Sequence, residues 1–386
     1  MRPTKLDRVL IWRLSGGSFW ILFVWVFFGF GCSPEETPQQ LNVESCSHVV
    51  VGTDYSSTSV SLLDGEGELC AANFLHSGSA LPGLVTALSG DVVLPNSKHP
   101  EGFISLIDRF PNGVITLVDP STALVHSQFS VGDSFAPNPQ DILFWSASRA
   151  YVPRHERNPS PTPEPEDWDE GDDILIVNPE NGNPLGRIAL ETELPSNPDG
   201  PAWLARPSRM VSSGKYAWVA LRCLSADFRD GGDGVLVSVD SETDEVSQRL
   251  DLAGFKNCGG LSADPGGRGF WGSCTGIFDH GAEQQAKESG LFFVRTSDGS
   301  TGSLSTVGAE ILGTGALSFD VEALDEDRVV YIALGDLMSG IPDELYLYDS
   351  SQGNSLRLHI SAPPYQLGGI HWQSDRGLLL VANANP

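Results

Sequence analysis

The sequence predicts an all-β fold of four-stranded antiparallel units, because one strand-and-turn pattern recurs along the chain. In each copy, alternating apolar residues, as in a half-buried strand, lead into a turn of Asp, Asn, Gly, Ser or Pro. A second strand follows the turn and completes a hairpin. The copies read SVSLLDGEG at 59–67, GVITLVDPST at 113–122, DILIVNPENG at 173–182, GVLVSVDSET at 234–243, LFFVRTSDGS at 291–300 and ELYLYDSSQG at 344–353.

Another pair of short strands lies between these hairpins, for example at 207–221, 260–274, 319–334 and 369–383. Each unit therefore has four strands, at a period of roughly 50–60 residues, and no segment shows convincing helical periodicity. A single four-stranded sheet cannot bury both of its faces, so such units pack face to face around an axis. This is the pattern of a β-propeller.

The number of blades follows from counting strands. Six repeats are visible, and a strand at 48–54 is left over. In a six-bladed ring, the last strand pair, at 369–383, and the first hairpin would together form the closing blade. The strand at 48–54 would then have no place in a blade. We expect a seven-bladed ring with an incomplete closing blade, because the chain stops at Pro386, where the other copies place their third strand.

Three stretches carry a resemblance to a known family. SRAYVPRHERN at 148–158, DDILIVNPENG at 172–182 and GLLLVANANP at 377–386 resemble the repeats of the YncE-like, or YVTN-repeat, β-propellers. The resemblance covers residues 47–386 and implies a seven-bladed ring that is usually exported and often lipid-anchored. These motifs specify a fold and say little about function.

The N-terminus predicts export. A basic start precedes the apolar stretch 18–30, which is the pattern of an export signal. Gly31 and Cys32 resemble the lipobox of bacterial lipoproteins, in which the cysteine is lipidated and becomes the new N-terminus. We therefore expect a signal peptide at 1–31 and a tether at 32–46. The alternative is an uncleaved membrane anchor, since about 20 apolar residues span a bilayer.

Both interpretations place the domain outside the cytoplasm. The expected location is the bacterial cell envelope, with a lipid anchor in the outer membrane, because Ser33 after the cysteine resembles outer-membrane sorting. The domain then lies in the periplasm or at the cell surface. The chain has 50 acidic and 23 basic residues, a formal net charge of −27. Such a surface repels nucleic acid and anionic lipid, so neither is an expected partner.

One face of the propeller is expected to bind. Connections between the second and third strands of a blade, and between blades, emerge on one face, and there they are long: 155–172, 192–205, 222–234 and 275–290. Function tends to lie on loops held by a rigid scaffold. Trp168, Trp203, Phe228 and Phe278 lie in these connections and are the binding-face candidates. The alternative is that these rings pack their own loops down.

The cysteines suggest one disulfide. Once the lipobox cysteine is lipidated, an odd number remains, which leaves one free thiol or an intermolecular bond. Cys223, Cys258 and Cys274 are expected at the face with the long connections, where Cys258 can pair with either of the other two. Cys46 with Cys70 is a second pairing to consider.

Few residues predict chemistry. Asp227, Asp230 and Asp233 could offer oxygen ligands to calcium, although solvated loop carboxylates are the simpler interpretation. No other cofactor is expected. The histidines occur singly, and no catalytic constellation is found. Cations near the ends of second strands could converge on an anionic ligand in the mouth of the ring, or could be isolated charges that balance an acidic chain: Arg109, Arg149, Arg154, His155 and Arg222.

Two functions remain. The first is a non-catalytic binding module at the cell envelope, with an envelope protein, peptide or glycan as its partner. The second is an enzyme of the lactonase or quinoprotein type, with a metal or cofactor at the axial mouth. The first is favoured, because propeller catalysis needs converging polar ligands and the sequence does not supply such a set.

Overall fold

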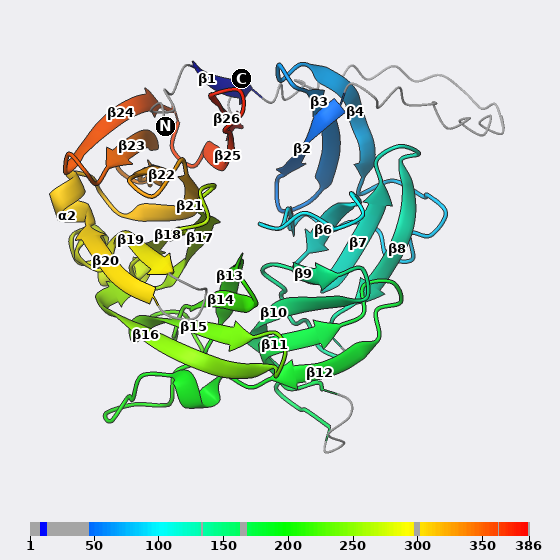
Figure 1. Ribbon diagram of the computed structural model, residues 1–386, viewed down its shortest axis with the longest axis horizontal. Coiled ribbons are helices and arrows are strands. Elements are labelled where there is room, and N and C mark those ends of the chain that lie inside the picture. The colour runs from blue at the N-terminus through cyan, green and yellow to red at the C-terminus, as the bar shows by residue number, and fades with distance from the viewer. Residues whose placement is uncertain are drawn as a thin grey trace, which may run out of the picture.

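A computed structural model of the chain shows a ring of β-sheets, a β-propeller, as the sequence predicts (Figure 1). The structure describes residues 8–13, 46–132, 134–162, 168–296, 302–361 and 363–384. Seven sheets are found in this part of the chain, five with four strands and two with three. Cys32 and most of the segments predicted as signal and tether lie outside the described residues.

The five four-stranded blades are antiparallel meanders, in which each strand pairs with the next along the chain. Their strands are β5 (Val92–Val93), β6 (Ile104–Asp108), β7 (Val114–Asp119) and β8 (Leu124–Ser130) in one blade, and β9 (Leu143–Ser146), β10 (Arg149–Arg157), β11 (Gly171–Val177) and β12 (Pro184–Ile188) in the next. The others are β13 (Pro207–Ser213), β14 (Tyr216–Leu221), β15 (Asp233–Asp240) and β16 (Glu245–Lys256); β17 (Cys258–Ala263), β18 (Gly269–Thr275), β19 (Ser289–Thr296) and β20 (Gly302–Gly308); β21 (Leu317–Ala323), β22 (Arg328–Ala333), β23 (Glu344–Asp349) and β24 (Asn354–Ile360).

The two three-stranded sheets contain the ends of the described chain. One has β2 (Cys46–Thr53), β3 (Thr58–Asp64) and β4 (Leu69–His76), so the strand that the sequence left over pairs with β3. The other has β25 (Leu367–Gln373), β26 (Leu378–Asn383) and β1 (Arg8–Arg13), which runs parallel to β26. The sequence assigns residues 8–13 to the signal peptide, whereas here their backbone extends the last sheet.

Contacts between these two sheets close the ring. Gln373 Nε2 donates a hydrogen bond to His48 Nε2 at 2.7 Å. Arg376 forms an ion pair with Glu66 and donates to the carbonyl of Gly65. The first and last repeats are therefore neighbours in space, as a closed propeller requires.

The recurring Asp or Asn of the sequence pattern has one structural role. In five of the six copies its Oδ1 accepts a hydrogen bond from the backbone N–H two residues further on, at 2.8–3.0 Å, and the turn of the copy at 291–300 lies outside the described residues. Such a turn reverses the chain between the third and fourth strands of a blade. Hydrogen bonds from the Ser121 hydroxyl and from the Ser121 backbone N–H hold the pKa of Asp119 below its ordinary value. The residues are Asp64, Asp119, Asn178, Asp240 and Asp349.

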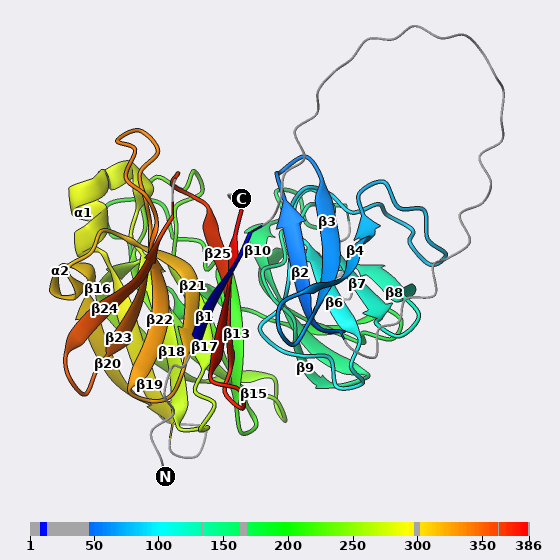
Figure 2. The ribbon, with the colours of Figure 1, turned by 90° about the horizontal axis from the view of Figure 1, so that it is seen from above.

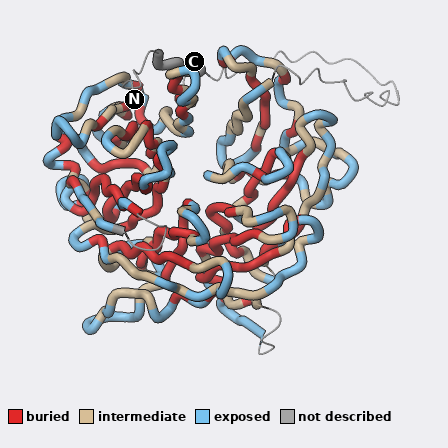
Figure 3. Tube along the Cα trace, viewed as in Figure 1, coloured by how far each residue is buried: buried red, intermediate tan, exposed pale blue. Residues whose placement is uncertain are grey.

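Buried residues follow the strands around the ring (Figure 3), and the hydrophobic clusters join side chains of neighbouring blades. Trp218 of β14 packs on Phe270 of β18 in the next blade, with ring centroids 5.5 Å apart. Both rings are fully or almost fully buried. Burying a large apolar side chain contributes about 1.5–3 kcal/mol, so each sheet is stabilised by the sheets on either side.

The strand order sorts the connections onto two faces. The loop face carries the 155–172, 192–205, 222–234 and 275–290 connections, and the hairpin face carries mostly tight turns. Every helix of the described chain lies in a connection on the loop face, where Figure 2 shows α1 and α2 on the same side of the ring. They are too short for a sequence period to reveal them: η3 (Glu191–Glu193), η4 (Phe278–His280), α1 (Ala282–Lys287) and α2 (Ala309–Leu312).

Candidate functional site

The candidate site lies at the axial end of the loop face, where strand ends from several blades meet. Arg206 precedes the inner strand β13, and Arg222 follows β14 of the same blade. Asn257 precedes the inner strand β17, and Phe319 belongs to the inner strand β21. Three successive blades therefore contribute side chains to one place. We use the name axial cluster for these four residues together with Arg109 and His155.

The arginines of the axial cluster differ in how they are balanced. Arg206 Nη1 donates to Glu156 Oε1 at 2.8 Å, and its Nη2 donates to the carbonyl of Ala226 at 3.1 Å. Arg109 forms an ion pair with Asp91. Arg222 instead donates from Nε to the amide oxygen of Asn257 at 2.7 Å, which is a neutral partner. One positive charge of the cluster is left without a carboxylate among the described residues.

Phe228 covers part of this cluster. The guanidinium carbon of Arg206 lies 3.7 Å from the Phe228 ring centroid, which is a cation–π contact. The ring of His155 stacks on the same Phe228, with centroids 6.1 Å apart and planes 13° apart. Beneath the ring, Arg206 Nε and His155 Nδ1 are buried and have no hydrogen-bond partner among the described residues. Unpaired buried polar atoms of this kind are unusual in folded proteins.

Burial and positive neighbours set the ionisation of the cluster. Burial lowers the pKa of His155 well below its ordinary value, and the charges of Arg222 and Arg206 lower it further. His155 is therefore a neutral imidazole. Burial and the charges of Arg206 and Arg109 also lower the pKa of Arg222 to about 9. The three arginines of the cluster are therefore close enough for the charges of two of them to act on the third.

A short segment of the β5–β6 connection, residues 94–97, contacts the inner strands of other blades. Asn96 Nδ2 donates to the carbonyls of Met210 in β13 and Leu261 in β17, at 3.3 and 2.9 Å. The buried carboxylate of Asp141 accepts from the backbone N–H groups of Asn96 and Met210, at 3.0 and 2.9 Å. These hydrogen bonds link the β5–β6 connection to the inner strands β13 and β17, which adjoin the axial cluster.

The sequence-predicted cations separate into two groups. Arg222, His155 and Arg109 belong to the axial cluster. Arg149 instead forms an ion pair with Asp244 at the hairpin end of β10. Arg154 forms a buried pair with Asp173, at 2.7 Å between Nη2 and Oδ2. These two arginines stabilise the blades and do not face the axis.

Of the four aromatic residues predicted to bind, two are exposed and two are packed against other residues. Phe228 and Phe278 are 48% and 56% exposed on the loop face. Trp168 is partly buried against the hydrophobic cluster around β10 and β11. Trp203 is half-buried beside Gly232, whose missing side chain leaves room for the indole. Two of the candidates are therefore surface residues, and the other two pack their own loops down.

The acidic residues of the 222–234 connection do not come together. Asp227 accepts from Ser225 Oγ at 2.7 Å, and Asp230 accepts from the Gly231 N–H at 2.7 Å. Asp233 begins strand β15. Throughout the described residues, no group of three or more His, Cys, Asp or Glu side chains could hold a metal ion.

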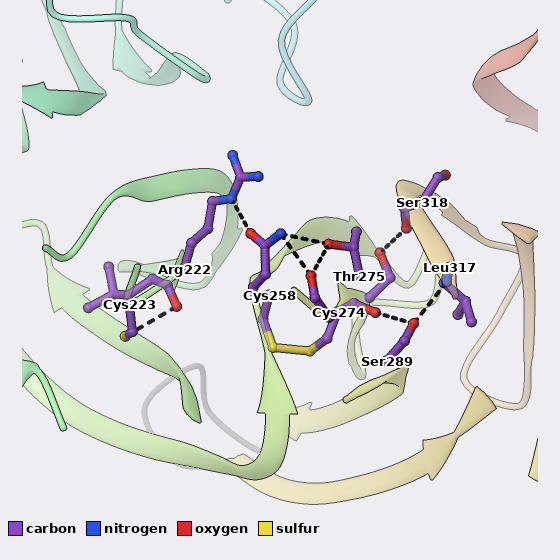
Figure 4. Close-up of a disulfide and its surroundings, with 12 residues drawn as sticks. Arg222, Cys223, Cys258, Cys274, Thr275, Ser289, Leu317 and Ser318 are labelled. Atoms are coloured by element: carbon purple, nitrogen blue, oxygen red, sulfur yellow. Dashed lines mark hydrogen bonds between the residues drawn. A yellow bond between two sulfur atoms is a disulfide. The ribbon is translucent and has the colours of Figure 1, made fainter. Parts of the chain in front are cut away.

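Of the two pairings that the sequence left open for Cys258, the structure has the bond to Cys274, with an S–S distance of 2.02 Å (Figure 4). The bond joins the start of β17 to the end of β18, and both cysteines are fully buried. Cys223 is a buried free thiol. Cys46 and Cys70 are also free, and burial together with a hydrogen bond to Cys70 raises the pKa of Cys46 to about 12.

Sequence reasoning missed Arg206, Asn257 and Phe319. Arg206 and Asn257 lie in connections between blades, and no local pattern marks them as neighbours of Arg222. Phe319 lies where a side chain on Gly259 would otherwise be, because a Cβ there would come within 2.8 Å of the Phe319 ring. The paired glycines at 259–260, unusual in a strand, were the available signal.

Comparison with known proteins bears on the fold. No protein-family model matches the sequence, and no curated protein matches it. Among solved structures, the β-propeller domain of Cps50 (Swd1) from Myceliophteria thermophila is similar, with a TM-score of 0.53 and 12% identity over 88% of this chain and 96% of that chain. This chain is a β-propeller. An identity of this size shows the fold and not the function.

Two other solved structures are also similar. Hydrazine synthase from Kuenenia stuttgartiensis has a TM-score of 0.48 and 13% identity, over 76% of this chain and 74% of that chain. Dihydro-heme d1 dehydrogenase NirN, in complex with DHE, has a TM-score of 0.46 and 15% identity over 90% of this chain. This chain spans 59% of the length of NirN. Within the described residues, no helix is long and apolar enough to cross a membrane.

Proposed function

We propose that the protein is an exported, lipid-anchored β-propeller that binds a partner through its loop face and catalyses no reaction. A propeller is in general a rigid scaffold for binding and interaction. The observation that carries the proposal is the gathering of exposed apolar side chains in loop-face connections. Exposed apolar groups of this kind often mark interaction sites.

The β22–β23 connection is the clearest case. Leu337, Met338 and Ile341 are 65%, 95% and 53% exposed. Apolar side chains at such exposure are not stabilising the connection that carries them, and a partner that covers them would gain the free energy of burial. Other loop-face connections expose further apolar residues: Val85, Phe110, Phe228, Phe278, Ile311 and Tyr365.

The location is part of the proposal. The basic start, the apolar stretch at 18–30 and the lipobox-like Gly31–Cys32 support export and lipidation, and the resemblance to YncE-like propellers is in keeping with both. Cleavage before Cys32 would remove β1, and β26 would then become the edge strand of its sheet. A tether of about fourteen residues spans up to about 50 Å when extended, so the loop face can reach partners away from the membrane.

The expected partner is a protein, peptide or glycan of the cell envelope. An acidic surface of net charge −27 disfavours polyanions, which leaves neutral or basic surfaces that can cover the apolar residues of the loop face. Contacts of this kind need no reacting groups.

Surface substitutions can test the proposal without altering the fold. We expect Phe278→Ser combined with Met338→Ser to abolish capture of envelope partners by the full-length chain, because both side chains are exposed on the loop face. The matched control is Leu124→Ser with Leu185→Ser, two exposed apolar residues of outer strands at the hairpin end. If the control pair loses the partners and the loop-face pair, still folded by circular dichroism, retains them, the proposal is wrong.

A further inference from the structure

Arg222 differs from every other arginine in the described segments between Cys46 and Ala384. Each of the others forms an ion pair with at least one Asp or Glu, and Arg222 forms none. The chain has 50 acidic and 23 basic residues, so carboxylates are plentiful. The lack of an ion pair to a carboxylate therefore distinguishes Arg222 from the other arginines of these segments.

The guanidinium of Arg222 is held in a fixed orientation. Its Nε donates to Asn257 Oδ1 at 2.7 Å. Asn257 is fixed in turn, because its Nδ2 donates to Thr275 Oγ1 at 2.8 Å and to the carbonyl of Gly276 at 3.1 Å. From below, the Phe319 ring supports the group, with 4.3 Å between the ring centroid and the guanidinium carbon. The side chain is preorganised before any ligand arrives.

The outer end of this guanidinium is unused. Within the described part of the chain, Nη1 and Nη2 have no hydrogen-bond partner, and Figure 4 shows this end of Arg222 turned away from the Cys258–Cys274 disulfide toward the middle of the ring. Two adjacent N–H donors in one plane match the two oxygens of a carboxylate, and this bidentate pairing is a preferred arrangement for arginine.

The surroundings reinforce the need for an anion. Arg109 and Arg206 each form an ion pair with a carboxylate, Asp91 and Glu156, whereas Arg222 forms none. Arg206 Nε is a second donor. The Arg206 residue is only 1% exposed, and this Nε has no hydrogen-bond partner among the described residues. These two donors can hydrogen-bond to an anion in addition to the ion pairs already present.

We propose that the axial cluster binds the carboxylate group of a small, singly charged ligand, with Nη1 and Nη2 of Arg222 as the anchoring donors. A carboxylate fits better than a phosphate, because a second negative charge would be opposed by Asp91, Glu156 and the net charge of −27. The inference rests on the loop face being the binding face, and it names the chemical group that this face recognises at the axis.

Calorimetric titration of the full-length chain tests the inference with three probes at constant ionic strength: benzoate, its neutral amide benzamide, and inorganic phosphate. We expect benzoate to bind, and benzamide and phosphate to bind at least about tenfold more weakly. Arg222→Gln should weaken benzoate binding on the order of tenfold or more, because hydrogen bonds to a charged group are lost. The matched control Arg229→Gln removes the same charge from an exposed side chain of the loop face, and it should leave the affinity unchanged.

Arg222→Lys keeps the positive charge and removes the paired donors. It should bind benzoate more weakly than the wild type, and a variant of equal affinity would overturn the bidentate assignment. The inference is also overturned if benzoate does not bind, if phosphate binds more tightly, or if Arg229→Gln weakens benzoate as much as Arg222→Gln. Partner capture by the Phe278 and Met338 variants is measured separately, so loss of the carboxylate site and loss of the proposed function give different results.

Discussion

Asp173 is the residue whose removal should destabilise one blade most. Its carboxylate accepts hydrogen bonds from Arg154 Nε and Nη2, both at 2.7 Å, and from Arg187 Nε at 3.0 Å. The side chains of Arg154 and Asp173 are only 2% and 0% exposed. Asp173→Ala leaves the guanidinium of Arg154 buried without its counter-ion. We expect the free energy of unfolding to fall by about 3–5 kcal/mol.

The control is a pair of the same chemistry at the surface. Arg249 contacts Asp251 through the same two nitrogens, Nε and Nη2, but the Asp251 side chain is 62% exposed. Asp251→Ala should therefore change the free energy of unfolding by less than about 1 kcal/mol. Urea unfolding of both variants and the wild type, followed by tryptophan fluorescence and circular dichroism, measures the difference. Equal losses in the two variants would show that burial does not determine the cost.

Three further predictions concern the anchor, the disulfide and the response to pH. Cys32→Ser should abolish labelling by a clickable fatty acid, and unchanged membrane attachment of an unlabelled wild type would instead favour an uncleaved helix. Cys274→Ser should lower the free energy of unfolding by about 3 kcal/mol, since the bond closes a short loop; unreduced peptides that show free Cys258 and Cys274 would contradict this. Burial raises the pKa of Asp172 to about 6, so the folded state binds the extra proton between about pH 4 and pH 6, and stability from this group is lost as the pH rises through that window. Asp172→Asn should flatten the fall in unfolding free energy across this window, and an unchanged slope would contradict the assignment.

The fold was predictable because its signals are local. Alternating strands and the turns at Asp64, Asp119 and Asp240 depend on residues only a few positions apart, and each turn is made as the sequence pattern indicates. The sheet of β25 and β26 was less predictable. Its third strand, β1, comes from the other end of the described chain, and no local pattern reports a pairing between Leu10 and Leu380.

The axial cluster was predictable only in part, because it is assembled from distant segments. Strand order places Arg109, His155 and Arg222 on one face, which is why they could be proposed together. The same argument also selected Arg149 and Arg154, which form ion pairs with Asp244 and Asp173 elsewhere. Whether a given arginine forms an ion pair with a carboxylate depends on the positions of side chains from different blades. A single sequence does not contain that information.

Hydrogen–deuterium exchange with a captured partner tests the central claim, that the loop face is the binding face. The account predicts slower exchange in the connections 222–234 and 275–290 and in the 334–343 segment that carries Met338, with unchanged exchange in the turns 240–245 and 349–354. Binding excludes water from the covered backbone, so protection locates the contact directly. Slower exchange in those turns, with none in the loop-face connections, would contradict the account.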